Sequence, residues 1–159
     1  MKPNLRRMQV EDRAAVASLL RRTPEFLPYE VIVAEELVDC YLADPVGSGY
    51  FFWVAEVDEV VVGYICFGPT PLTVGTWDIY WMAVSAECQG KGIGTGLLAL
   101  AEEEIRKSGG RMALIETSSK PLYEKTVRFY LGLKWVPVSR IPDFYSPGDD
   151  KITLQKKSY

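Results

Sequence analysis

The sequence contains no histidine among its 159 residues. This absence excludes a Ser-His-Asp triad, a histidine general base and a histidine-ligated zinc ion. Cysteine is scarce too, because Cys40, Cys66 and Cys88 are widely spaced and form no C-x-x-C pair. We interpret them as reduced, mostly buried hydrophobic side chains. We therefore expect no metal site and no covalent acyl-enzyme on an activated cysteine.

The sequence also lacks a long apolar run and an excess of positive charge. No stretch approaches the ~18 apolar residues of a membrane span, and residues 1–13 lack the apolar segment of a signal peptide. We therefore predict a cytoplasmic protein with no membrane partner. The formal net charge of -3 gives no basic footprint for nucleic acid and mildly favours cationic partners.

Length and composition are those of one globular domain. A chain of 159 residues buries roughly 68 to 70% of the surface that its unfolded form exposes, which is enough for a sizeable core. The sequence is 48% hydrophobic and 25% charged, as globular domains are. It contains no repeat, linker or low-complexity tract, so we predict a single domain over residues 1–159.

Hydrophobic patterning predicts strands alternating with amphipathic helices. Strand patterns occupy residues 5–8, 50–57, 60–67, 77–84, 112–117, 135–141 and 152–155. Two helices are predicted before residue 44, the second starting at Pro28, whose fixed φ suits the first helical turn. The apolar face of this second helix is predicted at Val31, Ala34, Val38 and Tyr41. A third helix, which carries Leu97, Leu98, Ala101 and Ile105 inward, follows a glycine-rich turn, and a fourth covers residues 123–131. This order predicts an α/β (α+β) fold, a mixed sheet with helices packed on it.

A glycine-rich turn separates the strand at 77–84 from the third helix. It reads Gln89-Gly90-Lys91-Gly92-Ile93-Gly94-Thr95-Gly96, at a place where free N–H groups and the helix dipole attract an anion. The dinucleotide and Walker patterns both fail, because the glycine or hydroxyl residue that each requires is missing. Tight helix packing is the alternative. Four glycines at ~1 kcal/mol each in helix propensity favour the anion site instead.

The segment Gln89-x-x-Gly92-x-Gly94 resembles the Gln/Arg-x-x-Gly-x-Gly/Ala signature of the GNAT superfamily of N-acetyltransferases. Its context is similar to that family as well, in Gly63-Tyr64-Ile65 upstream and Phe129-Tyr130-Leu131-Gly132-Leu133 downstream. The resemblance implies a mixed, mostly antiparallel central sheet of about seven strands flanked by about four helices.

The resemblance also implies acetyl-CoA as the acetyl donor, without a metal. Its pyrophosphate is expected on the N–H groups of residues 90–95, and its pantetheine arm beside the backbone of residues 82–84 as an added strand. Tyr123 stands where many relatives carry an asparagine that contacts the arm, with Ser118 or Ser119 as alternatives. The residues expected to bind the donor are Met82, Ala83, Val84, Gln89, Gly90, Lys91, Gly92, Ile93, Gly94, Thr95 and Tyr123.

Two catalytic roles follow from the resemblance. Tyr130 matches the tyrosine that protonates the leaving thiolate, and a core aromatic is the alternative. Asp78 matches the strand glutamate that accepts the amine proton in one branch of the family. Strand alternation predicts that Asp78 shares a face with Tyr80, Met82 and Val84. A solvated Asp78, with Glu116 or a water chain accepting the proton, stays open.

The sequence therefore predicts acetyl transfer from acetyl-CoA to a primary amine by direct attack in a ternary complex. The acceptor is expected to be a small molecule or a peptide. A non-catalytic acyl-CoA sensor would carry the same glycine turn and differ only in turnover, whereas an interaction domain would bind no CoA. A homodimer stays open.

Overall fold

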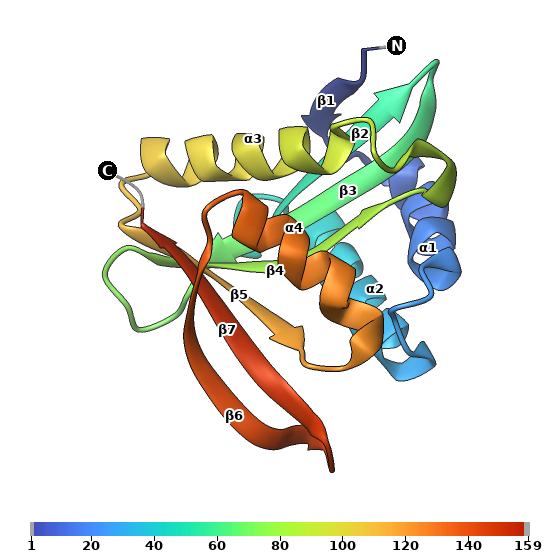
Figure 1. Ribbon diagram of the computed structural model, residues 1–159. Helices are drawn as coiled ribbons and strands as arrows, with labels where there is room; N and C mark the ends of the chain where they lie inside the picture. The colour runs from blue at the N-terminus through green and yellow to red at the C-terminus, as the bar shows by residue number, and fades with distance from the viewer. Residues whose placement is uncertain (1, 158–159) are drawn as a thin grey trace.

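The computed structural model describes residues 2–157, which form one seven-stranded sheet in the order β1-β2-β3-β4-β5-β7-β6 (Figure 1). Neighbouring strands are antiparallel except for β4 and β5, which are parallel. The mixed, mostly antiparallel sheet expected from the sequence is confirmed. The strands are β1 (Asn4–Arg7), β2 (Phe51–Val57), β3 (Val60–Pro69), β4 (Thr76–Val84), β5 (Met112–Ser118), β6 (Val136–Ser146) and β7 (Asp149–Lys157).

Four α-helices cover the two faces of this sheet, with α4 crossing in front of it and α2 lying behind it in Figure 1. Short 3-10 turns precede α1, α3 and α4 at η1 (Val10–Asp12), η2 (Ala86–Cys88) and η3 (Pro121–Tyr123). Within residues 2–157 no helix is long and apolar enough to cross a membrane. The helices are α1 (Arg13–Arg22), α2 (Pro28–Ala43), α3 (Ile93–Lys107) and α4 (Glu124–Gly132).

Each face of the sheet has its own apolar core. One core joins the sheet to α3 and α4, and the other joins it to α1 and α2. The apolar positions of α2 and α3 recur every three to four residues, so they form one stripe per helix. These stripes are buried as predicted, at Val31, Ala34, Val38 and Tyr41 in α2 and at Leu97, Leu98, Ala101 and Ile105 in α3.

The sheet splits between β4 and β5. Their parallel pairing ends at Ile79 and Ile115, although β4 continues to Val84 along β3 and β5 continues to Ser118 along β7. The backbone of β4 beyond Ile79 therefore has a strand neighbour on one side. This split leaves an edge in the middle of the sheet, where an extended ligand can lie.

A β-bulge in β4 corrects one prediction. Cys66 of β3 pairs with Trp81, and the next residue, Phe67, pairs with Ile79, so Tyr80 is an extra residue. An extra residue shifts the alternation of side chains by one position. Met82 consequently packs on the α3 and α4 core together with Ile79. Asp78 lies on the other face, so the prediction that it shares a face with Met82 and Val84 is wrong.

The last two strands are longer than predicted. Patterning indicated residues 135–141 and 152–155, whereas the hairpin runs through Val136–Ser146 and Asp149–Lys157. All residues of β6 are exposed, so no alternation between buried and exposed positions marks this strand. The C-terminal hairpin projects beyond the rest of the sheet in Figure 1. It places Tyr145 and Asp149 beside the split.

Candidate functional site

The glycine turn owes two of its glycines to backbone conformation. Gly90 and Gly92 have φ values of 76° and 82°, in the left-handed region that costs other residues roughly 1–2 kcal/mol. A Cβ added at either position would meet no atom within 4 Å. Helix packing therefore does not explain them, and the space beside both is open to a ligand.

The start of α3 directs free N–H groups into that space. The first hydrogen bond of the helix runs from the Gly96 N–H to the Gly92 carbonyl at 2.9 Å. The amides from Gly92 to Thr95 precede this bond and have no carbonyl one turn earlier in the helix. Together with the helix dipole they form a site for negative charge.

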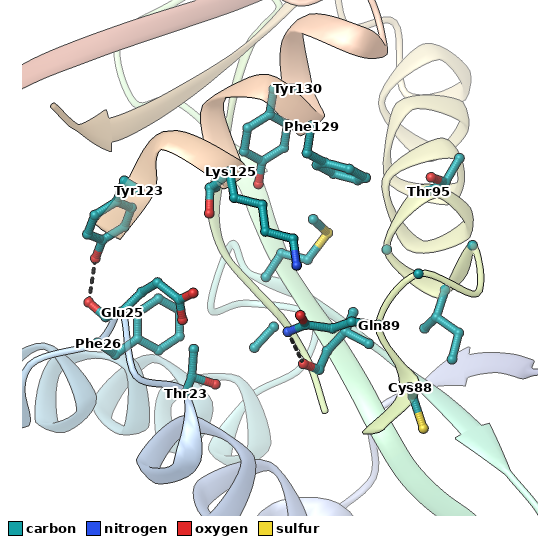
Figure 2. A pocket seen from close by; sticks show the side chains of 18 residues that line it. Thr23, Glu25, Phe26, Cys88, Gln89, Thr95, Tyr123, Lys125, Phe129 and Tyr130 are labelled. Carbon is teal, nitrogen blue, oxygen red and sulfur yellow. Dashed lines mark hydrogen bonds between the residues drawn. The ribbon is translucent and has the colours of Figure 1, made fainter. Parts of the chain in front are cut away.

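A cavity of about 500 Å³ opens at this turn, between the glycines and α4 (Figure 2). We name it the glycine-turn cavity. The residues predicted to bind the donor line it, with the exception of Lys91. They are Met82, Ala83, Val84, Gln89, Gly90, Gly92, Ile93, Gly94, Thr95 and Tyr123.

A second cavity of about 540 Å³ lies on the other side of the split, between α2, β4, β5 and the β6–β7 hairpin. We name it the acidic cavity after the four carboxylates that line it, Glu25, Glu30, Glu116 and Asp149. The two cavities meet, because both are lined by Glu25, Phe26, Met82, Tyr123, Thr126 and Tyr130.

Tyr130 stands where the cavities meet. The residue is 6% exposed, and its ring makes edge contacts with Phe129 and Trp135 at 5.2 and 6.1 Å between centroids. Its hydroxyl points into the glycine-turn cavity in Figure 2 and has no hydrogen-bond partner among residues 2–157. Burial raises the pKa of this phenol above its ordinary value. The hydroxyl is therefore protonated at neutral pH and free to donate.

Tyr123 ties the α1–α2 loop to the start of α4. Its hydroxyl donates to the carbonyl of Glu25 at 2.7 Å, which Figure 2 marks with a dashed line between these two residues. Burial first, and then the charges of Glu30 and Glu25, raise the pKa of this phenol. The alternatives, Ser118 and Ser119, are also engaged: Ser118 donates to Asp149, and Ser119 Oγ accepts the Asp150 N–H at 2.8 Å.

Asp78 lines neither cavity. Its carboxylate accepts the Thr70 hydroxyl at 2.6 Å. The nearby Tyr80, in contrast, lines the acidic cavity. Burial, followed by the negative charge of Asp78, raises the pKa of the Tyr80 phenol to about 12. The bulge thus places a phenol, and not the carboxylate, in the cavity wall.

Glu116 lines the acidic cavity as a largely exposed side chain. Lys151 Nζ lies 3.5 Å from its carboxylate, and the side chain is 53% exposed. A carboxylate with this exposure is partly solvated and screened, although the Lys151 side chain is only 16% exposed. Glu116 therefore adds negative charge to the part of the cavity wall that is open to solvent.

Sequence reasoning missed several residues of the site. Glu25 and Phe26 lie in the loop between α1 and α2. A loop has no hydrophobic periodicity, so the sequence does not indicate which of its residues face the site. Phe26 is held by an edge contact with Trp81 at 5.3 Å between ring centroids. Lys125 of α4 extends across the glycine-turn cavity toward Gln89 in Figure 2. Its charge alone could not distinguish it from other helix-surface lysines.

The geometry joins an anion site, a split strand edge and a buried phenol in two connected cavities. The sequence model described as the acetyltransferase (GNAT) family matches residues 15–132. The chain belongs to this family. Within residues 2–157, no group of three or more histidine, cysteine or acidic residues is arranged to hold a metal ion.

Individual GNAT relatives agree with this assignment. An uncharacterised N-acetyltransferase of Methanocaldococcus jannaschii is 33% identical over 107 residues, which are 67% of this chain and 65% of that protein. The match therefore spans just under two thirds of that relative. A crystal structure assigned to the GNAT family, from Desulfovibrio desulfuricans, is 38% identical with a TM-score of 0.94, covering 98% of this chain and 99% of that one.

A more distant structure, described as an acetyltransferase from Salmonella typhimurium, was solved with acetyl-CoA. It has a TM-score of 0.76 at 19% identity and covers 99% of this chain and 94% of that one. At this identity the likeness is one of fold.

Proposed function

We propose that this GNAT-family protein is an acetyl-CoA-dependent N-acetyltransferase that acts on a primary amine by direct attack in a ternary complex. The observation that carries the proposal is the meeting of two cavities at Tyr130. One cavity has the anion site at the start of α3, and the other has a carboxylate-lined wall that suits a cationic amine. Donor and acceptor can therefore approach from opposite sides of the split sheet.

The residues of the glycine-turn cavity fit acetyl-CoA. The amides of Gly92 to Thr95 would hold the pyrophosphate, with the charge of Lys125 facing the same space. The free edge of β4 at residues 82–84 would pair with the pantetheine arm. The Gln89 side chain donates to the Val84 carbonyl at 3.1 Å. When the pantetheine arm pairs with β4, the Gln89 side chain would either share this carbonyl with the arm or rotate away from it.

Proton transfers divide between the two sides of the split. When bound, acetyl-CoA supplies an acetyl thioester that is open to attack by a neutral amine. Tyr130 Oη, kept protonated by burial, donates its proton to the departing sulfur. Phe129 and Trp135 fix the ring of Tyr130 for this role.

The amine must lose its own proton, because an alkyl ammonium has a pKa near ~10.4. We propose that Asp78 finally accepts this proton. Because Asp78 lines neither cavity, the proton would reach it through the Tyr80 hydroxyl or a water molecule. In this role Asp78 is a positioning residue and Tyr80 is the group that faces the amine.

The experiment that tests the function combines binding and turnover. We expect calorimetry to give one acetyl-CoA per chain and a CoA-release assay to detect acetylation in a screen of alkylamines, polyamines, aminoglycosides and peptides. Binding without turnover for every amine would favour the alternative of a non-catalytic acyl-CoA sensor. Absence of acetyl-CoA binding would contradict both. The single domain, the cytoplasmic location and the homodimer stay predictions.

A further inference from the structure

The acidic cavity carries more negative charge than one amine requires. Lys120 Nζ lies 3.6 Å from Asp149, and Lys151 Nζ lies 3.5 Å from Glu116, so lysines offset two of its four carboxylates. Glu25 and Glu30 line the cavity without an ion-pair partner among residues 2–157. One reacting ammonium therefore leaves at least one carboxylate unmatched.

These carboxylates act together on two phenols. Tyr123 of η3 and Tyr145 of β6 both line the acidic cavity. Tyr145 is 41% exposed, and the partial desolvation of its phenol, followed by the charges of Glu116, Asp149 and Glu30, raises its pKa to about 12. The charges of Glu30 and Asp149 also raise the pKa of Tyr123. Carboxylates from α2 and β7 and the rings of Tyr123 and Tyr145 thus line the same cavity, a combination that binds cations.

The reacting amine belongs at a different point, beside Tyr130. That side chain is buried, its hydroxyl is directed into the space that joins the cavities, and it has no hydrogen-bond partner among the described residues. The cavity wall also includes aromatic and aliphatic side chains, among them Phe26, Trp81, Met82 and Ile115. Such side chains favour an apolar spacer.

We propose that the acceptor carries a second ammonium group, joined to the reacting amine by an apolar spacer, and that Glu30 with Tyr123 and Tyr145 binds it. This inference rests on the proposed N-acetyltransferase function and names the acceptor chemistry. A free diamine has this chemistry, and so does a peptide amine followed by a lysine side chain.

The test uses three amines with the same five-carbon skeleton. They are 1-aminopentane, 1,5-diaminopentane and 5-aminopentanoate, whose far ends are uncharged, positive and negative. We expect kcat/KM at low ionic strength to be on the order of tenfold higher for the diamine than for 1-aminopentane, and lowest for the aminopentanoate. Added salt should reduce the difference in kcat/KM between the three amines. Two tetrapeptides with lysine or glutamate at the second position separate a peptide source from a free diamine.

A matched pair of variants locates the second ammonium site. Glu30 accepts the Leu27 N–H at 2.8 Å and so satisfies one backbone donor at the start of α2. Glutamine can accept the same bond, so Glu30→Gln removes the charge and keeps the cap. We expect it to bring the ratio of kcat/KM for diamine to monoamine close to one. Glu36→Gln makes the same change on an exposed position of α2 outside both cavities and should leave the ratio unchanged.

The outcomes separate this inference from the function on which it rests. If the diamine does not exceed 1-aminopentane and the lysyl peptide does not exceed the glutamyl peptide, the second-ammonium site is refuted. The second-ammonium site is also refuted if none of the probes is acetylated and none raises the Tm of the complex with CoA. An unchanged ratio in Glu30→Gln would refute the assigned position. Loss of acetyl-CoA binding itself would refute the proposed function instead.

Discussion

Replacing Gly92 with alanine should separate the two uses of the glycine turn, backbone shape and donor binding. Gly92 caps α3 with φ at 82°, and an L-residue pays roughly 1–2 kcal/mol to hold that conformation. No atom lies within 4 Å of the added Cβ, so no packing clash adds to this cost. We expect the free energy of unfolding to fall by about 1–2 kcal/mol, measured by urea denaturation.

The same Cβ would lie in the space proposed for the pyrophosphate. It would push a phosphate away from the amides of Gly92 to Thr95, which a helix start leaves free. We expect acetyl-CoA to bind at least about tenfold more weakly, or about 1.4 kcal/mol less favourably. Isothermal titration calorimetry on the folded variant measures this loss directly. A bulkier Gly92→Val should weaken binding further.

Gly109 supplies the matched control at the other end of α3. It has φ at 78° and, like Gly92, no atom within 4 Å of an added Cβ. Gly109→Ala should therefore destabilise the fold by the same amount and leave acetyl-CoA affinity unchanged. Wild-type affinity in folded Gly92→Ala would refute the assignment of the turn to the donor. An equal loss of affinity in both variants would attribute the effect to stability.

Three further results are expected. Tyr130→Phe keeps the buried ring and removes an unpartnered hydroxyl, so kcat should fall by about 10²- to 10⁴-fold with little change in KM for acetyl-CoA. An unchanged kcat, measured where chemistry limits turnover, would show that Tyr130 has only a structural role. Lys125→Met should raise the Kd for acetyl-CoA in a salt-dependent way, whereas Arg128→Met, on the same helix but outside both cavities, should not. Asp78→Asn should remove the acid limb of the pH profile of kcat/KM; a limb that persists and moves with the pKa of the acceptor amine would show that the enzyme selects neutral amine from solution.

The sequence was informative wherever burial followed a regular period. The stripes of α2 and α3 could be read because one face of each helix meets a core. The strand at 77–84 could be read from its apolar run, because β4 meets a core on each face of the sheet. The glycine turn could be read because left-handed φ values restrict residue choice at Gly90 and Gly92. β6 offered no such signal, since all its residues are exposed.

The acceptor side of the site could not be predicted in the same way. Glu25 and Phe26 enter from a loop, and Tyr145 enters from an exposed hairpin strand, so none has a periodic pattern. Their position depends on long-range contacts, such as the bond from Tyr123 to the Glu25 carbonyl across 98 positions of sequence. Local propensity carries no information about such pairs.

One extra residue in β4 accounts for much of the arrangement. Pairing between β4 and β5 ends at Ile79, and the bulge residue Tyr80 follows at once. A bulge bends its strand and increases its twist, which explains why β4 diverges from β5 at that point and leaves the edge at residues 82–84 free. The same residue places a phenol in the acidic cavity and keeps Asp78 behind it. The free edge of β4, the phenol in the wall of the acidic cavity and the position of Asp78 behind it thus have one structural origin. Alternation along β4 could not reveal it, because the bulge itself breaks that alternation.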